Sequence, residues 1–226
     1  MQQEIIAYYD RLAPNYDASR FANSYGRFID ARERALLRAW LPASATSILE
    51  LGCGTGRLSG FATIATDAST ASLAIARTRE RATRFAAADA ERLPLPPAMF
   101  DAVYAFHLLM HLETGAIHNI FTEAARVLRP GGVLIADIAS KTRRDIAGKH
   151  RAGEHAWHGA TALTSREFEA AGRAAGLDLR RMTGLLFLPV HRLPERARPP
   201  LAHVDSWLAG RWPSLSSYLI ASFAKP

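Results

Sequence analysis

The chain has 226 residues, of which 49% are hydrophobic and 22% charged, values typical of a globular protein with one full core. No apolar run approaches the roughly 20 residues of a membrane span, and the polar N-terminal segment does not resemble a secretory signal. The single cysteine, Cys53, excludes an intrachain disulfide and fits a reducing compartment. We therefore expect a cytoplasmic protein with a single domain over residues 1–226, present as a monomer or a homodimer.

The formal net charge is +7 and the isoelectric point about 10.1, so the partner could be a nucleic acid or an anionic small molecule. Basic residues are concentrated in 141–151 and 180–198. Most are arginine and alanine is abundant, which is also typical of codon usage in a GC-rich genome. Both interpretations, a functional basic surface and a compositional bias, stay open.

Apolar periodicity predicts a helix over residues 2–17, interrupted near its end by Pro14, and a second helix over 26–40. Together they would form an N-terminal helical cap, residues 1–42. Short apolar runs then alternate with helical patterns. Strands are predicted at 47–51, 62–66, 84–88, 100–106 and 133–138, and helices at 71–81 and 113–128. This alternation is typical of a parallel sheet with helices on both faces.

The pattern weakens after residue 139. Residues 140–163 are predicted to form a long loop or lid. Thr164 to Glu167 resembles a capping box that begins a helix, which Gly176 ends. A sixth strand over 177–190, a proline-rich irregular insertion over 189–213 and a last strand over 218–223 would form an antiparallel hairpin at the sheet edge. The prediction is an α/β fold with a seven-stranded, mostly parallel sheet whose last strand is antiparallel.

Glycines follow the first predicted strand in the order Gly52, Gly54 and Gly56. A parallel strand that ends in glycines lets the backbone approach a nucleotide closely. Asp67 ends the second strand 15 positions after Gly52, and an acid there can accept hydrogen bonds from both ribose hydroxyls. The G-x-G-x-G spacing departs from the G-x-G-x-x-G of dinucleotide folds. Glu50 would repel a pyrophosphate and suits a ligand with an ammonium group.

The segment Ile48-Leu-Glu-Leu-Gly-Cys-Gly-Thr-Gly56 closely resembles the first motif of class I S-adenosylmethionine-dependent methyltransferases. Four further segments resemble the family in order and spacing, and Tyr9 to Asp17 resembles the N-terminal helix of its small-molecule branch. The four segments are Asp67-Ala-Ser69, Asp89-Ala-Glu-Arg-Leu-Pro94, Phe100-Asp-Ala-Val103 and Arg126-Val-Leu-Arg-Pro-Gly-Gly132. The resemblance covers residues 8–139 strongly and 164–224 loosely, and it implies a Rossmann-like fold.

The resemblance implies S-adenosylmethionine as cofactor, with S-adenosylhomocysteine as product. Gly52 and Gly54 would approach its methionine part, Asp67 would hold the ribose, Asp89 would bind the adenine amino group, and Tyr16 would close over the ligand. The full set of cofactor-binding candidates is Tyr16, Glu50, Leu51, Gly52, Cys53, Gly54, Asp67, Ala68, Asp89, Ala90 and Phe106.

One departure from the family pattern concerns the helix after the glycine loop. Only 11 positions separate Gly56 from Asp67, fewer than is usual. The helix is therefore expected to shrink to a single turn across 58–61, which puts contacts from Arg57 and Leu58 in doubt.

Catalytic candidates follow the fourth strand at His107 and His111. Histidine titrates near neutrality and can act as a general base, and in a helix this spacing would put both rings on one face. His111 also matches a position at which the family commonly has histidine, so it could simply hold the loop. No metal is expected, because no third ligand lies nearby in sequence. Tyr9, His155 and Trp157 are candidates for acceptor binding, although the latter two could belong to an ordinary packed loop.

Four functions compete. The first is methyl transfer to a small-molecule acceptor, such as a quinone precursor or a secondary metabolite, on oxygen, nitrogen or carbon. The second, RNA modification, is motivated by the basic composition, but no RNA-binding module is found and a nucleic-acid partner is disfavoured. A catalytically silent cofactor-binding protein is the third. A dehydrogenase is the fourth, and both Glu50 and the glycine spacing oppose it.

Overall fold

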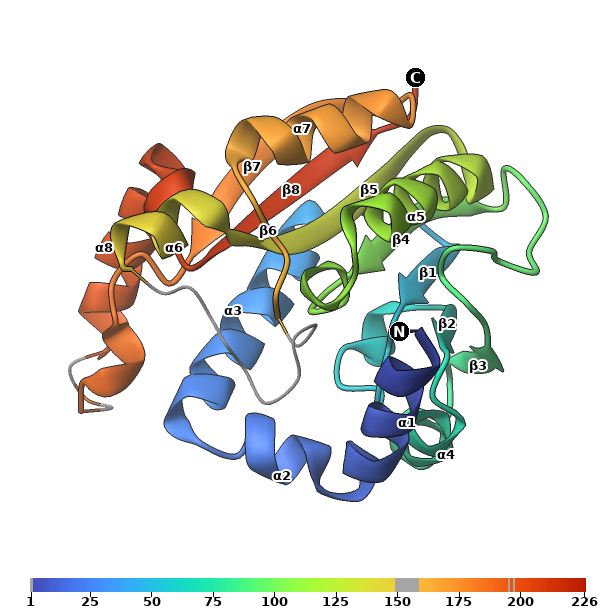
Figure 1. Cartoon of the computed structure of the whole chain (residues 1–226), viewed down its shortest axis with the longest axis horizontal. Coiled ribbons are helices and arrows are strands. Elements are labelled where there is room, and N and C mark those ends of the chain that lie inside the picture. The colour runs from blue at the N-terminus through green and yellow to red at the C-terminus, as the bar shows by residue number, and fades with distance from the viewer. Residues whose placement is uncertain (1, 149–158, 195, 197) are drawn as a thin grey trace.

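The computed structural model describes residues 2–148, 159–194, 196 and 198–226. Its strands form one sheet in the order β3-β2-β1-β4-β5-β8-β7, with the two-residue strand β6 beside β5 (Figure 1). β8 pairs antiparallel with both its neighbours, and every other pairing is parallel. The strands are β1 (Ile48–Leu51), β2 (Ile64–Asp67), β3 (Arg84–Ala87), β4 (Phe100–Ala105), β5 (Leu128–Ser140), β6 (Ala162–Leu163), β7 (Asp178–Leu185) and β8 (Tyr218–Ala224). The predicted mostly parallel α/β sheet with an antiparallel last strand is confirmed, and β6 is the strand beyond the seven expected.

Helices cover both faces of this sheet. The described α-helices are α1 (Gln2–Leu12), α2 (Tyr16–Arg20), α3 (Ser24–Trp40), α4 (Thr70–Arg79), α5 (Thr114–Val127), α6 (Lys141–Ile146), α7 (Ser165–Ala174) and α8 (Arg198–Arg211). α5 and α7 pack in one hydrophobic cluster with β1, β4, β5 and β8, whereas α3 packs in a second cluster on the opposite face. The helix predicted over 2–17 is divided at Pro14 by a short 3-10 turn between α1 and α2.

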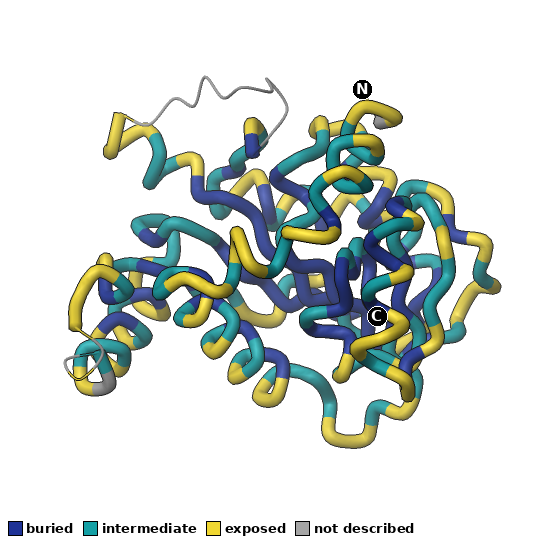
Figure 2. Tube along the Cα trace, turned by 90° about the horizontal axis from the view of Figure 1, so that it is seen from below, coloured by how far each residue is buried: buried dark blue, intermediate teal, exposed yellow. Residues whose placement is uncertain are grey.

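Side chains alternate between the two clusters along the central strands, as the two-residue period of a strand requires. Val103 and Leu134 face α5 and α7, and their chain neighbours Tyr104 and Ile135 face α3. All four are at most 1% exposed. Figure 2 shows buried stretches of the chain gathered at the centre of the molecule, with exposed turns around them.

Three phenylalanines join the α5–α7 layer to β8. The ring centroids of Phe121, Phe168 and Phe223 lie 5.4–6.0 Å apart in edge-to-face contacts, a geometry that aromatic quadrupoles favour.

The predicted capping box begins α7. The Thr164 side chain accepts from the backbone N–H of Glu167, and the Glu167 carboxylate accepts from the backbone N–H of Thr164.

The proline-rich segment 189–213 is not irregular as expected, because α8 occupies its second half. Pro199 and Pro200 lie in the first turn of α8. The backbone N–H groups of a first turn have no partner inside the helix, so prolines are tolerated there. The predicted lid over 140–163 likewise contains α6, which Ser140 caps, and β6. Its residues 149–158 lie outside the described part of the chain.

Among the described residues, no helix combines the length and the apolar character needed to cross a membrane.

We predict that Gly172→Ala destabilises the protein by about 1–3 kcal/mol, the usual cost of overpacking a core. A Cβ at Gly172 would lie 2.4 Å from the Phe223 ring, which the other two rings hold in place. Gly115→Ala, in α5, is the matched control because an added Cβ there meets no atom within 4 Å. It should be neutral or stabilising by up to about 1 kcal/mol. Urea unfolding of both variants measures the difference, and equal stabilities would contradict the packing described.

Candidate functional site

The carboxyl ends of β1, β2 and β4 open into one cavity, which the turn after β3 and the N-terminal helices also line. The cavity holds about 1130 Å³ of atom-free space, part of it open to solvent. Parallel sheets place small-molecule sites at this edge. The site is therefore built from strand ends that are far apart in sequence.

The glycine loop after β1 presents bare backbone to the cavity. Gly52 and Gly54 both line it and have positive φ angles of 64° and 52°, a region that favours glycine. An added Cβ at Gly54 would meet no atom within 4 Å, so that space is open to a ligand. The helix that follows is the single 3-10 turn Ser59–Phe61, as the short spacing predicts.

Asp67, at the end of β2, orders the loop around it. One carboxylate oxygen accepts from the backbone N–H of Gly54 at 2.7 Å and the other from that of Ser69 at 2.8 Å. Burial raises the pKa of Asp67, and the N–H donors oppose this. After β3, Asp89 lines the cavity and one of its oxygens accepts from the backbone N–H of Glu91 at 2.9 Å. Two acidic residues thus mark successive strand ends along the cavity wall.

Glu50 lies on β1, just before the glycine loop, with only 4% of its surface exposed. Its Oε2 accepts a 2.5 Å hydrogen bond from the Ser59 hydroxyl. Burial raises the pKa of Glu50 to about 8, although the Ser59 hydrogen bond and the charge of Arg57 oppose the shift. The carboxyl group is therefore mostly protonated at neutral pH.

The N-terminal helices cover the cavity. The ring centroids of Tyr9 and Tyr16, which both line it, lie 6.0 Å apart. Asp10 accepts from the Ser69 hydroxyl at 2.6 Å, and Asp17 accepts from the Thr55 hydroxyl at 3.0 Å. These bonds fasten α1 and α2 to the loops after β2 and β1.

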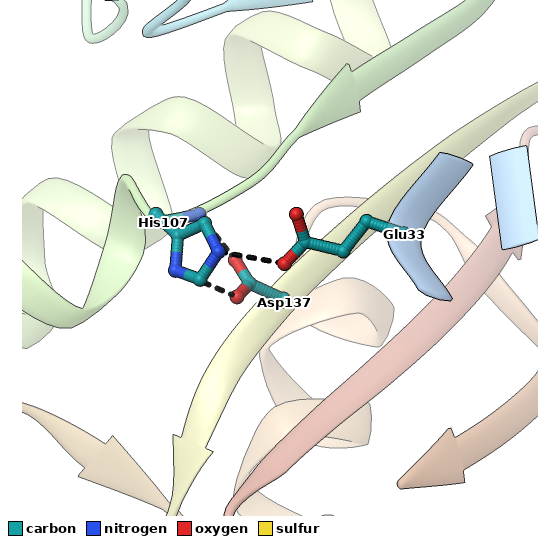
Figure 3. Close-up of side chains that lie close together, drawn as sticks. All are labelled: Glu33, His107 and Asp137. Carbon is teal, nitrogen blue, oxygen red and sulfur yellow. Dashed lines mark hydrogen bonds and ion pairs between the residues drawn. The ribbon is translucent and has the colours of Figure 1, made fainter. Parts of the chain in front are cut away.

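His107 leaves β4 with a positive φ of 57°, an uncommon backbone conformation for a residue other than glycine. Its backbone N–H donates to Asp137 Oδ1 at 2.7 Å, and its ring Nε2 lies 2.6 Å from Glu33 Oε1 (Figure 3). Glu33 projects from α3 and is fully buried, and its second oxygen binds Arg57 at 2.6 Å. We name Glu33, Arg57, His107 and Asp137 the buried charge cluster.

The charges in this cluster shift one another's pKa values. Burial opposes ionisation of Glu33, but His107 and Arg57 outweigh it and lower its pKa. Burial also opposes the charge on His107, yet Glu33 and Asp137 raise its pKa above the ordinary value. Burial raises the pKa of Asp137 to about 6, and His107 opposes that shift.

His111 has a different environment. The segment between the two histidines is not an α-helix, because His107 adopts its positive φ and only Leu109–His111 forms a 3-10 turn. His111 Nδ1 accepts from the backbone N–H of Gly159 at 3.0 Å, and its ring packs against Tyr9 at 5.8 Å. This arrangement fits the alternative interpretation, that His111 holds a loop.

The structure brings nearly all the predicted site residues to one cavity. Arg57 and Leu58, which the short helix put in doubt, line it as well. Leu51 does not, because its side chain is fully buried in β1. His155 and Trp157 lie outside the described residues. The predicted residues on the wall are Tyr9, Tyr16, Glu50, Gly52, Cys53, Gly54, Asp67, Ala68, Asp89, Ala90, Phe106, His107 and His111.

Sequence reasoning missed Glu33 and Asp137. Each carried a signal: Glu33 shares the apolar stripe of its helix with Ile29 and Leu37, and Asp137 interrupts an apolar strand. With His107, they place three possible metal-ligand atoms within 4.8 Å of one another. However, Glu33 is already bound by the Arg57 guanidinium, whose positive charge opposes a cation at this position.

An adenosyl ligand with an ammonium group fits these walls. The bare glycine backbone leaves room beside Gly54, and Asp67 and Asp89 place carboxylates at strand ends suited to ribose and adenine. Glu50 adds a carboxyl group that could face an ammonium. No phosphate-binding cation lies in the glycine loop at 52–56.

Residues 49–136 match the family model described as a methyltransferase domain. The chain is 32% identical over 140 residues to a malonyl-[acyl-carrier protein] O-methyltransferase of Enterobacter lignolyticus, covering 59% of this chain and 52% of that protein. It is 34% identical over 142 residues to a demethylmenaquinone methyltransferase of Thermus thermophilus, covering 56% and 62%. The chain thus spans little more than half the length of these relatives.

Among solved structures, the fold is similar to an S-adenosylmethionine-dependent methyltransferase of Thermotoga maritima described as a possible histamine N-methyltransferase. The TM-score is 0.73 at 21% identity, over 96% of this chain and 98% of the other. The domain match, the sheet order and the glycine loop agree with one another. Residues 49–136 thus match a methyltransferase domain, and the fold is similar to that of an S-adenosylmethionine-dependent methyltransferase.

Proposed function

We propose that this protein transfers a methyl group from S-adenosylmethionine to a small-molecule acceptor. The observation that carries the proposal is the convergence of the open glycine backbone, Asp67 and Asp89 on one cavity that also reaches His107. The cofactor supplies an electrophilic methyl group, so the protein has to position the acceptor and accept its proton. The relatives named for malonyl-[acyl-carrier protein] and for demethylmenaquinone support a small or tethered organic acceptor.

In this proposal Gly52 and Gly54 approach the methionine part, Asp67 binds the ribose and Asp89 the adenine. Tyr16 covers the ligand, and Tyr9 lies on the acceptor side. We place the protein in the cytoplasm, in keeping with its one cysteine. We also propose that residues 1–226 form a single domain and that the protein is a monomer or a homodimer. The basic composition keeps RNA as a second candidate acceptor.

Asp67→Ala should weaken binding of S-adenosylhomocysteine by about 1–3 kcal/mol, the cost of removing hydrogen bonds to a charged group. Isothermal titration calorimetry measures the loss. Asp67 also holds the Gly54 and Ser69 backbone, so thermal melting must show that the variant remains folded. Asp17→Asn changes a residue of α2 in the N-terminal cap and leaves β2 unaltered. This variant should bind S-adenosylhomocysteine more tightly than Asp67→Ala does. An unchanged affinity in Asp67→Ala would refute the ribose site.

Cofactor binding should release a proton from Glu50. In the free protein Glu50 keeps this proton at any pH below its pKa of about 8. A ligand ammonium stabilises the carboxylate form and so lowers the pKa of Glu50. At a pH between the pKa of Glu50 in the complex and its pKa in the free protein, binding releases up to one proton. Calorimetry at pH 7 in two buffers of different ionisation enthalpy should give different heats. Adenosine, which lacks the ammonium, and the Glu50→Gln variant should release none, and equal heats for the full cofactor would contradict this role.

Methyl transfer itself is tested with methyl-labelled S-adenosylmethionine. Label should enter phenolic, enolic or carboxylate small molecules, and S-adenosylhomocysteine should appear in equal amount. Transfer to tRNA at low salt would favour the RNA alternative instead. Tight cofactor binding with no transfer to any acceptor would identify a silent binding protein and refute the proposal.

A further inference from the structure

The buried charge cluster goes beyond what cofactor binding requires. Glu33 is 0% exposed, and both its oxygens are occupied at 2.6 Å, one by Arg57 and one by His107 Nε2 (Figure 3). Burying such a carboxylate is costly, and both its partners line the cavity. Glu33 reaches the cavity only through these partners, because it does not itself line the wall.

The imidazole of His107 is fixed on several sides. Asp137 holds its backbone N–H at 2.7 Å, and Phe21 and Tyr218 contact the ring edge-on at 6.3 and 5.8 Å. Nε2 faces Glu33 at 2.6 Å, which requires the proton of a neutral ring to lie on Nε2. Nδ1 is 3.8 Å from Asp137 Oδ2, beyond hydrogen-bond distance, and has no hydrogen bond among the described residues. In the neutral ring the lone pair therefore lies on Nδ1.

We propose that Glu33 is a positioning residue that fixes His107 so that Nδ1 accepts the proton of a hydroxyl acceptor of phenolic or enolic type. This inference rests on the proposed methyl transfer and specifies its acceptor. Nδ1 takes the proton while the acceptor oxygen forms its bond to the methyl carbon. The electron pair of the broken carbon–sulfur bond stays on sulfur, so the products are the methylated oxygen, S-adenosylhomocysteine and an imidazolium. Solvent then removes the proton from His107.

Charge balance in the cluster supports proton uptake. With a neutral ring, Glu33, Asp137 and Arg57 sum to one negative charge, and the adjoining Asp30–Arg34 pair adds none. A proton on Nδ1 brings the cluster to neutrality. Glu33 and Asp137 raise the pKa of His107 against burial and the opposing charge of Arg57. Tyr218, whose ring contacts the imidazole, pairs its hydroxyl with that of Tyr25 at 3.0 Å.

The modest basicity of an imidazole disfavours an aliphatic ammonium as acceptor. Such a nitrogen has no lone pair until it loses a proton, and its pKa, near that of lysine at about 10.4, lies far above that of an imidazole. A hydroxyl oxygen already has lone pairs and loses its proton as the new bond forms, which is the step that a general base assists.

The first test needs no acceptor. In protein labelled with ¹⁵N at histidine, the shifts of His107, assigned with His107→Gln, should show the neutral tautomer protonated on Nε2. Glu33→Gln should lower the His107 pKa by about one unit or more. Asp30→Asn is the matched control, because Asp30 binds Arg57 at 2.8 Å but not the histidine. It should leave the pKa of His107 nearly unchanged.

A neutral tautomer protonated on Nδ1 would overturn the proposal in the wild-type protein, even if Glu33→Gln fails to fold. An unchanged His107 pKa in a folded Glu33→Gln variant would overturn it as well. Neither result bears on cofactor binding. Failure of the proposed function would appear separately, as wild-type protein that binds no S-adenosylhomocysteine or transfers no methyl group.

The second test uses a phenolic acceptor found in the labelling assay. Glu33→Gln should lower kcat about 100-fold or more, the range for loss of general-base assistance, and leave KM for S-adenosylmethionine within about twofold. The rise of kcat with pH should move to lower pH with the His107 pKa. An unchanged kcat and pH profile, or acceptors that are all amines, would refute the assignment.

Discussion

The buried carboxylate of Glu33 is the interaction on which the site depends. A carboxylate removed from water must be matched by cations or hydrogen-bond donors. The two partners of Glu33 come from different parts of the chain, Arg57 from the glycine loop and His107 from the end of β4. α3 is thereby tied to two strand ends at once. Removing one partner of such a buried pair typically costs about 3–5 kcal/mol. The relative position of cap and sheet is thus set by charge as well as by apolar packing.

Hydrogen bonds from nearby side chains explain how the cavity tolerates the nearly missing helix after the glycine loop. After the glycine loop only one 3-10 turn remains, so several backbone groups lose the partners that a longer helix would provide. The Tyr104 hydroxyl donates to the Leu58 carbonyl at 2.9 Å, and the Thr83 hydroxyl donates to the Ser59 carbonyl at 2.7 Å. The Ser59 hydroxyl in turn donates to Glu50. Side chains from neighbouring strands and loops therefore replace the hydrogen bonds of the absent turns.

The sequence predicts what depends on local periodicity. Apolar runs that end in glycine or aspartate located β1, β2 and the cavity edge. The Thr164 capping box located α7 because both of its hydrogen bonds lie within four residues. The prolines at 199 and 200 led to the wrong prediction for 189–213, because a proline that breaks a helix interior is harmless in a first turn.

The buried charge cluster was less accessible to the sequence because its members lie on α3, the glycine loop, β4 and β5. His107 was predicted, but the partners that determine which nitrogen is available were not. Ile29, Glu33 and Leu37 follow one helical face, so an acid on an apolar stripe was visible. No spacing rule identifies its partner across 74 residues, since only the sheet order brings α3 beside the end of β4. The local motif thus predicts the cofactor region, and tertiary structure determines the acceptor chemistry.

Two acidic residues in different environments have different roles in the proposed reaction. Glu50, buried and bonded to a hydroxyl, remains protonated until a positive ligand group approaches. Glu33, bound by the Arg57 guanidinium and the His107 ring, stays ionised and favours the protonated form of that ring. A methyl sulfonium loses its positive charge when the methyl group leaves, and in the same step the cluster around His107 loses its negative charge. The attraction between cofactor and cluster therefore falls as product forms, which favours release of S-adenosylhomocysteine over its retention.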